Sequence, residues 1–205
     1  MLTADEQVRQ AALAKPSGGP ILDELRHSTR DIHERLHLHT GFAALQDGTI
    51  DRASYRALLS RLYGFYHPFE VAAETAPTRT CWLKSDLSAL SMTKDQIANL
   101  PRCIAMPALA NSEQVTGALY VVEGSSLGGR ALAPCVDRLL GAGVIGGRRF
   151  FTGYGSETGA RWRGFLADLA LLPPDPITRG RCLAAAIETF EAFELWLSGW
   201  EGLKQ

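Results

Sequence analysis

Four of the five histidines in this sequence lie within residues 27–39, next to two arginines. His33 and His37 are four residues apart, so a helix would place both imidazoles on one face, where two such groups can bind a metal ion. No nearby carboxylate completes an evident metal site, and we do not expect zinc. On a helical wheel, Arg26 lies about 20° from His33 and Arg30 about 60° from it.

This face has the chemistry of a haem-binding surface. A neutral imidazole ligates iron, guanidinium groups pair with propionates through two hydrogen bonds, and Leu22 and Leu36 offer apolar surface to a porphyrin. The alternative is a structural histidine beside solvated arginines, which is the more common arrangement. This helix alone favours that alternative, so a haem site requires a second feature elsewhere in the sequence.

The second feature is the stretch LYVVEGSSLGGRAL, residues 119–132, which has three glycines inside a helical apolar pattern. Three interior glycines cost a helix about 3 kcal/mol relative to alanine. Gly124 and Gly128 share a face with Tyr120 and Gly117, so a neighbouring helix or a ligand can approach the backbone there. Close packing of two helices is the alternative, but it needs only one pair of small residues. A third glycine and two serines exceed that need and favour a bend in the helix.

The elements that must position these residues are helices throughout. Apolar periodicity and capping residues predict helices over residues 21–40, 51–74, 84–90, 93–100, 111–140 and 156–171, and a last helix that begins after Asp175. Asp51 and Thr93 are expected N-caps, and Pro68 is expected to kink or divide its helix. The last helix aligns an apolar stripe of Leu183, Ala186, Phe190, Phe193, Leu197 and Trp200.

These patterns predict one all-α domain, since we find no strand alternation and no internal repeat. The first twenty residues end in AKPSGGP, which predicts a flexible or loosely docked segment over residues 1–20 and a helix of at most residues 2–14. The domain itself is expected to span residues 21–205. The helix with His33 offers an imidazole and arginines, and the helix with the glycines offers exposed backbone. A flat, anionic ligand with a metal at its centre fits between these two helices.

The composition is ordinary for a globular domain, with 205 residues, 46% of them hydrophobic and 21% charged. The net charge of −1 gives no general reason to expect nucleic acid or a membrane surface as a partner. The four cysteines are far apart and form no C-x-x-C pair, which favours a reducing compartment over a disulfide scaffold. Without a signal pattern or an apolar stretch of membrane-spanning length, a cytoplasmic location is expected.

Three segments resemble the haem oxygenase family. LRHSTRDIHERLH resembles the family's haem-ligand helix, LYVVEGSSLGG resembles the distal helix of its bacterial members, and ETFEAFELWL resembles its aromatic last helix. The order and spacing of the segments also match, so the resemblance covers roughly residues 21–200. It implies a single-domain helical bundle with haem between a proximal helix and a bent distal helix.

The resemblance implies a haem-binding role for five side chains. His33 matches the proximal ligand of the haem iron, and Arg26 and Arg30 match basic positions that face the propionates. Tyr120 matches a distal tyrosine that reaches a propionate in bacterial members. Arg163 lies near a further propionate-binding position.

The distal segment carries the positions implied to take part in catalysis. Gly124 and Gly128 match glycines that let the distal helix bend over haem. Ser125 departs from the family pattern, because mammalian members carry an aspartate there that organises water. Either a hydroxyl and backbone groups hold the water in this chain, or another side chain supplies the carboxylate.

The reaction that the resemblance implies is oxidative cleavage of haem b, both cofactor and substrate, to biliverdin, carbon monoxide and ferrous iron, with O2 as co-substrate. No flavin or iron–sulfur motif is visible, so a ferredoxin- or flavodoxin-type reductase is the expected electron donor. Arg148 and Arg149 are candidates for its docking surface, although a solvated loop is the favoured explanation for them. A biliverdin-binding photoreceptor is a candidate acceptor of the product.

Two other functions remain as alternatives. A haem carrier without turnover would keep His33 and the arginines and would not need the glycine segment. A thiaminase-like hydrolase on a related scaffold would need a nucleophilic cysteine with carboxylates. Cys81, Cys103, Cys135 and Cys182 all lie outside the two matched motifs, which argues against the hydrolase.

Overall fold

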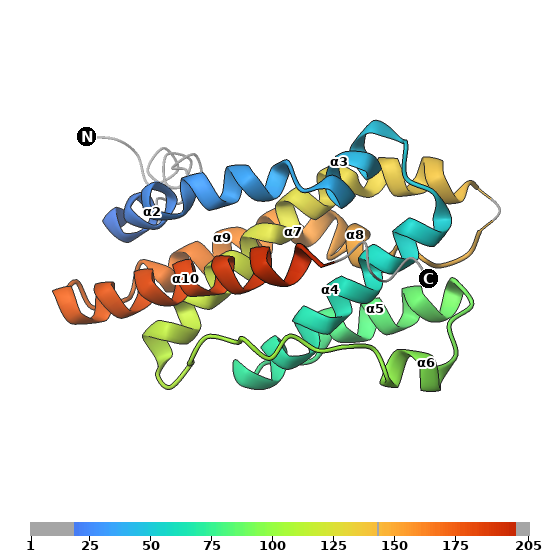
Figure 1. Cartoon of the computed structure of the whole chain (residues 1–205). Coiled ribbons are helices and arrows are strands. Elements are labelled where there is room, and N and C mark those ends of the chain that lie inside the picture. Colours follow the sequence, from blue (N-terminus) through green and yellow to red (C-terminus); the bar gives the residue numbers. More distant parts are fainter. Residues whose placement is uncertain (1–18, 143, 200–205) are drawn as a thin grey trace, which may run out of the picture.

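The computed structural model describes residues 19–142 and 144–199, which form a bundle of helices (Figure 1). In chain order these are α2 (Gly19–His37), α3 (Thr40–Asp47), α4 (Arg52–Ala72), α5 (Thr78–Ala89), α6 (Lys94–Ala98), α7 (Ser112–Leu140), α8 (Arg149–Thr152), the 3-10 helix η1 (Gly155–Glu157), α9 (Thr158–Leu169) and α10 (Pro176–Leu197). The described residues contain no strand, which confirms the prediction of an all-α fold. The predicted helix over residues 2–14 lies outside the described residues.

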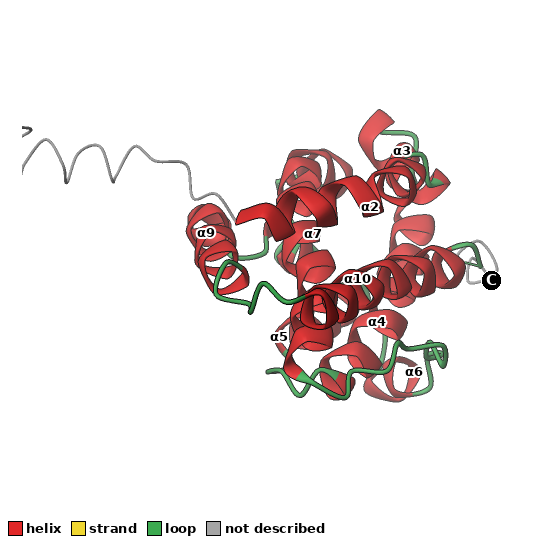
Figure 2. Ribbon diagram, turned by 90° about the vertical axis from the view of Figure 1, so that its left-hand side faces the viewer, coloured by secondary structure: helices red, strands yellow, loops and turns green. Residues whose placement is uncertain are grey.

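Helix α10 is the central element of the bundle, because it packs against both α2 and α7. Figure 2 looks along α10 and shows α2 on one side of it and α4 on the other. The predicted apolar stripe explains this position: Ala186, Phe190, Phe193 and Leu197 are buried, and Leu183 is partly buried against the core. Trp200, the last member of that stripe, lies outside the described residues.

Helix α4 runs through Pro68 without being divided there, contrary to one of the two expectations for this proline. Pro68 has no N–H to donate to the carbonyl of Gly64 one turn earlier. That carbonyl instead accepts a hydrogen bond from the Cys103 N–H at 2.9 Å. A chain segment from elsewhere therefore replaces the missing helical bond, and α4 continues to Ala72.

Local capping signals predicted several helix ends correctly. Asp51, Thr93 and Asp175 each accept a hydrogen bond from a backbone N–H in the first turn of the helix that follows. Asn111 caps α7 in the same way, and α7 reaches Leu140 as expected. These residues act within their own turn, which is why the sequence alone identifies them.

Other helix boundaries differ from the prediction. The helix expected at residues 84–90 begins earlier, at Thr78, and α3 and α8 were not predicted. Pro77 gives α5 no side-chain cap; instead the buried Glu70 carboxylate accepts hydrogen bonds from two backbone N–H groups of its first turn, those of Arg79 and Thr80. Asp86 likewise accepts from two N–H groups at the start of α8, at 2.8 Å each. Caps that come from another helix leave no local sequence signal.

None of the described helices is both long enough and apolar enough to cross a membrane.

Candidate functional site

The two features singled out in the sequence line one cavity of about 810 Å³. His33 reaches it from α2, and Gly124, Ser125 and Gly128 reach it from α7. Most of the remaining lining is apolar and comes from leucine, valine and phenylalanine side chains of α2, α3, α4, α7, α8 and α10. A large apolar cavity with a few convergent polar groups is the usual form of a small-molecule or cofactor site.

His33 presents a neutral imidazole to this cavity. Its ring meets the His37 ring edge-on, with centroids 4.5 Å apart, and the Phe190 ring at 6.2 Å. Partial burial lowers the pKa of His33, and the nearby His37 lowers it further, while Glu34 acts in the opposite direction. A histidine with a lowered pKa is unprotonated at neutral pH, so a ring nitrogen is available to a metal ion.

The arginines of α2 stand beside His33 at the edge of the cavity. Arg26 and Arg30 both line it, and their side chains are 59% and 62% exposed. Each has only a long contact to an acidic neighbour, at 3.7 Å and 3.5 Å, and exposed pairs of this kind contribute little to stability. Both guanidinium groups can therefore turn to an anionic group of a ligand.

Tyr120 faces these arginines from α7. Burial raises the pKa of its hydroxyl, while a hydrogen bond with Thr29 of α2 and the charge of Arg26 lower it. The hydroxyl is thus protonated at neutral pH and stands next to the same edge of the cavity as the arginines. Three donors from two helices converge at this edge.

The glycines of α7 differ in what surrounds them. A Cβ added at Gly128 would meet no other atom within 4 Å, and one at Gly124 would meet only the Trp162 ring, at 3.7 Å. A Cβ at Gly117 would instead collide with the backbone carbonyl of Cys182 in α10. Both interpretations of the glycine run therefore apply, but to different positions: Gly117 allows a helix crossing, and Gly124 and Gly128 leave space in the cavity.

Ser125 has a partner that the sequence did not indicate. The hydroxyl oxygens of Ser125 and Tyr66 are 3.0 Å apart, and the Ser125 hydroxyl also donates to the carbonyl of Val122 at 2.7 Å. Tyr66 lies in α4 and lines the cavity, and burial raises the pKa of its hydroxyl. No aspartate or glutamate is among the described residues that line the cavity. The sequence left two replacements for the distal aspartate, either a hydroxyl with backbone groups or a carboxylate from another side chain. The described part of the cavity wall contains a hydroxyl, that of Ser125, and no carboxylate.

Three arginines lie away from the cavity wall: Arg163, which was expected near a propionate, and Arg148 and Arg149, for which a solvated loop was favoured over a docking surface. Arg163 is exposed on α9 and does not line the cavity, whereas its neighbour Trp162 does. Arg148 binds Asp137 at 2.6 Å and donates to two carbonyls of the preceding loop, and the Arg149 guanidinium lies over the Trp82 ring. Both Arg148 and Arg149 thus hold parts of the fold together.

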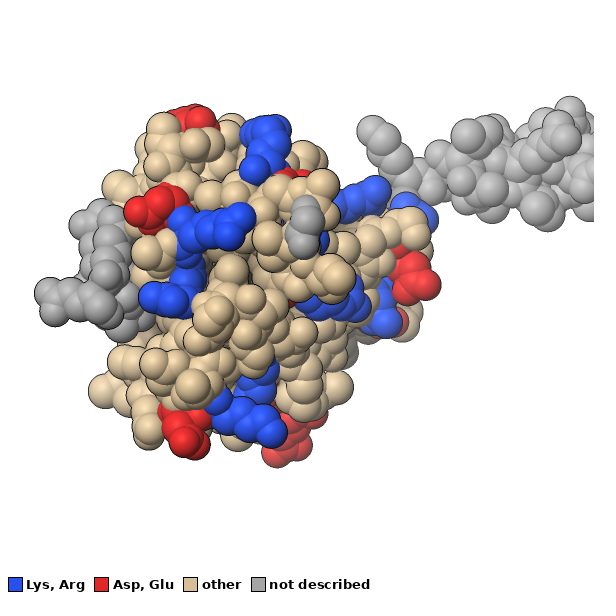
Figure 3. All heavy atoms as spheres, turned by 90° about the vertical axis from the view of Figure 1, so that its right-hand side faces the viewer, with Lys and Arg blue, Asp and Glu red and all other residues tan. Residues whose placement is uncertain are grey.

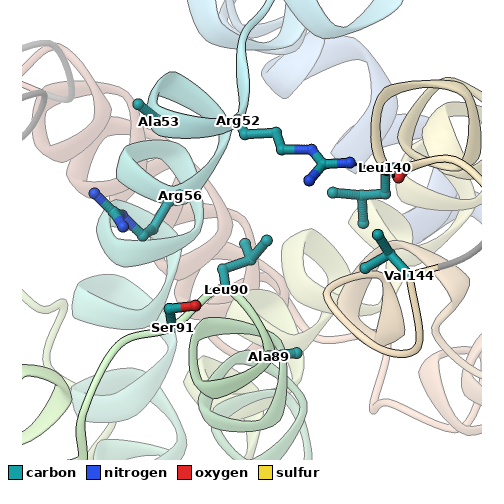
Figure 4. A pocket seen from close by; sticks show the side chains of 8 residues that line it. All are labelled: Arg52, Ala53, Arg56, Ala89, Leu90, Ser91, Leu140 and Val144. Atoms are coloured by element: carbon teal, nitrogen blue, oxygen red, sulfur yellow. Dashed lines mark hydrogen bonds between the residues drawn. The ribbon is translucent and has the colours of Figure 1, made fainter.

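A second, smaller hollow of about 310 Å³ lies between α4, α5 and the end of α7 (Figure 4). Arg52 extends across it and donates to the carbonyl of Leu140 at 2.8 Å, while Arg56 points away from the hollow. Among the described residues, no group of three or more His, Cys, Asp or Glu side chains is placed to hold a metal ion. The larger cavity, which both features singled out in the sequence line, is the candidate site.

Comparison with known proteins decides the family. The sequence profile of the family "Heme oxygenase" matches residues 20–199. The chain belongs to the haem oxygenase family. No curated protein matches the sequence significantly.

Solved structures of haem oxygenases share the fold. The chain is similar to haem oxygenase-1 from the cyanobacterium Synechocystis, solved in complex with haem, with 19% identity and a TM-score of 0.72 over 89% of this chain and 92% of that one. It is also similar to haem oxygenase from Leptospira interrogans, with 17% identity and a TM-score of 0.70 over 87% and 98% of the two chains. This haem oxygenase is thus a haem-degrading enzyme by family and a single helical domain by fold.

Proposed function

We propose that this haem oxygenase binds haem b in the cavity between α2 and α7 and cleaves it to biliverdin, carbon monoxide and ferrous iron. The observation that carries the proposal is the cavity itself, which His33 and the open glycines Gly124 and Gly128 line from two helices. A carrier would need the histidine side only. The unfilled backbone at the glycines is what an enzyme needs in order to hold small reactants against the other face of the macrocycle.

His33 would ligate the iron from the proximal side, and Arg26 and Arg30 of α2 together with Tyr120 of α7 would hold the propionates. The low pKa of His33 keeps its imidazole unprotonated, and the two arginines have no close competing partner. Arg163 would need to turn from its exposed position on α9 in order to join them. Bound haem supplies the iron centre that activates O2 and the porphyrin that is oxidised.

On the distal side, two glycines of α7 leave part of the cavity unfilled. Gly124 and Gly128 leave room for O2 and water between the backbone and the haem. The wall of α7 carries no histidine, arginine or carboxylate that lines this space. Among the described residues, Ser125 and Tyr120 line the cavity with hydroxyl groups from α7, and Tyr66 does so from α4. These hydroxyls would hold water rather than act as strong acids.

Electrons would come from a separate ferredoxin- or flavodoxin-type reductase, because the sequence shows no flavin or iron–sulfur motif. Figure 3 shows one face of the molecule, on which basic side chains alternate with acidic and uncharged ones. With Arg148 and Arg149 both bound within the fold, the exposed Arg26 and Arg30 beside the cavity are better candidates for donor docking. We further propose a cytoplasmic location and a bilin-binding photoreceptor as a candidate product acceptor.

The test adds haemin to the purified protein and then a reductant and air. We expect a Soret band of the bound complex on addition of haemin, followed by its loss and the rise of biliverdin absorption. His33→Ala should abolish turnover, because the iron loses its ligand. His27→Ala is the matched control, since His27 is exposed on the same helix and does not line the cavity.

Three results would contradict the proposal. A stable Soret band without biliverdin would identify a carrier. Absence of a Soret band would exclude both haem functions. Normal turnover in His33→Ala would remove His33 from the role of ligand.

A further inference from the structure

His33 and His37 lie one helical turn apart on α2, and both line the cavity. Side chains four residues apart on a helix are neighbours, and these two rings have centroids 4.5 Å apart. Ligation of haem iron uses His33 alone, so it gives no role to a second imidazole in the same cavity. Both residues are exposed, so an ion in solution can reach them.

The distance between the two rings suits a shared metal ion. Metal ions bind an imidazole nitrogen at about 2.0–2.1 Å, so two rings at right angles around one ion have centroids roughly 4.5 Å apart. Among the described residues, neither ring has a hydrogen-bond partner, and the other ring near His33 is that of Phe190, at 6.2 Å. Rotation of the two side chains can therefore turn one nitrogen of each to the same ion.

Two imidazoles form an open metal site rather than a closed one. Closed zinc sites have four protein ligands, and the described residues include no group of three or more His, Cys, Asp or Glu side chains placed to hold a metal ion. Water would complete the coordination sphere, so an ion binds reversibly here. Imidazole ligands suit iron, nickel and copper, whereas magnesium and calcium ions prefer oxygen ligands. The pair thus suits transient binding of a transition metal ion.

We propose that His33 and His37 together bind a divalent transition metal ion, and that this site holds the ferrous iron released by the reaction. The assignment to ferrous iron rests on the proposed function. While the macrocycle is intact, its nitrogens surround the iron, so His33 can reach the iron from the α2 side and His37 cannot. Once the iron has lost these nitrogens, it can gain the His37 imidazole and water in their place. This exchange of ligands transfers no electron.

The first experiment needs no haem and uses Ni²⁺ as the probe, because nitrogen ligands bind Ni²⁺ more tightly than Fe²⁺. Calorimetric titration of the haem-free protein, without a histidine tag, should show one bound ion. Loss of an outer partner of a metal ligand costs roughly 10–100-fold in affinity, so His37→Gln, which loses a ligand, should bind at least about tenfold more weakly. His27→Gln is the matched control, because His27 is exposed on the same helix and does not line the cavity.

Absence of Ni²⁺ binding by the wild type would overturn the proposal, and so would binding by His37→Gln as tight as that by His27→Gln. Thermal unfolding of each variant without metal checks that it folds as the wild type does.

The second experiment uses competition, because the ion and haem both need His33. In the wild type, Ni²⁺ should weaken haemin binding, measured by the Soret band, in proportion to the fraction of protein that holds the ion. In His37→Gln the same concentration of Ni²⁺ should have little effect. Equal weakening in both proteins would contradict a metal site that includes His37.

The assignment to ferrous iron is tested during turnover with a chelator that becomes coloured when it binds Fe²⁺. In the wild type, the colour should appear later than the absorption of biliverdin, and His37→Gln should shorten this delay. An equal delay in both proteins would overturn the assignment.

These experiments separate the metal site from the proposed function. If Ni²⁺ binding depends on His37 but haemin gives no Soret band, the proposed function fails and the metal site stands. If haemin is cleaved but Ni²⁺ binding does not depend on His37, the metal site is wrong and the proposed function stands.

Discussion

Gly117 and Gly128 lie on the same helix, yet they serve opposite purposes. At Gly117, α7 crosses α10 so closely that any side chain would collide with the backbone of Cys182. At Gly128, no atom would meet an added Cβ within 4 Å, because the helix faces the cavity. One glycine permits a helix crossing and the other leaves space in the cavity, so residue type alone does not separate scaffold from site.

The two regions of α7 are also held in different ways. The region around Gly117 and Ala118 is buried by packing against α10. The region around Gly128 lacks a packing partner on its cavity side. Just before it, α7 is attached from behind by Arg79, which binds Glu123 and the backbone of Val122. Packing against α10 holds the first region, whereas a buried ion pair and packing against α8 and α9 hold the second.

Loss of the ion pair should have the largest effect. Arg79→Met leaves the Glu123 carboxylate without its partner in a mostly buried site, where the two side chains are only 7% and 21% exposed. We expect the free energy of unfolding to fall by about 3–5 kcal/mol, measured by urea denaturation. Arg179→Met is the matched control, because its pair with Glu24 is more exposed and should contribute under about 1 kcal/mol. Equal losses in the two variants would contradict this view of the Arg79 pair.

Disruption of the helix crossing should come next. Gly117→Ala forces α7 away from α10, and overpacking of this kind costs about 3 kcal/mol of stability. Gly180→Ala in α10 is the control, because nothing lies within 4 Å of its added Cβ, and it should gain up to about 1 kcal/mol. Thermal unfolding measures both, and an unchanged midpoint for Gly117→Ala would show that the crossing tolerates a side chain.

The smallest effect is expected where α10 meets α2 at the surface. Glu194 accepts two hydrogen bonds from Arg35, at 2.7 Å and 3.0 Å, and this bond lowers the pKa of Glu194 from its usual 4.5. A carboxyl with a lowered folded-state pKa stabilises the fold above the unfolded value, and this stabilisation is lost as the pH falls through the folded value. Glu194→Gln should therefore reduce the loss of stability below about pH 4.5.

Acid titration of the unfolding midpoint measures this difference, with Glu188→Gln as the exposed control on the same helix. A Glu194→Gln variant that loses stability with falling pH as steeply as the wild type would show that the pair with Arg35 does not contribute. Because both partners are largely at the surface, added salt should diminish the effect in the wild type.

The sequence predicted those parts of the fold and the site that depend on neighbours in the chain. The extent of α7 followed from its apolar period, and the faces of His33 and Gly124 followed from helical spacing. What it could not predict depends on residues far apart. Asp86 caps α8 across more than sixty residues, and Tyr66 looks like any other aromatic of a buried helix until Ser125 is placed beside it.

Arg148 is a second instance of this limit. In the sequence it stands after a glycine-rich loop and is indistinguishable from a solvated arginine. In the structure its guanidinium group closes that loop, by bonds to the carbonyls of Gly141 and Val144 and to Asp137. The partners of long, charged side chains depend on tertiary contacts, which local sequence patterns do not encode.

The most direct test of the account is the thermal unfolding of wild type and Gly128→Ala, each with and without stoichiometric haemin. Without haemin, the alanine should stabilise the helix by up to about 1 kcal/mol, because no atom opposes its Cβ. A ligand raises the unfolding midpoint according to its affinity for the folded state. We predict that haemin raises the midpoint of Gly128→Ala by less than it raises that of wild type. An equal or larger rise in the variant would contradict the claim that this glycine leaves room for haem.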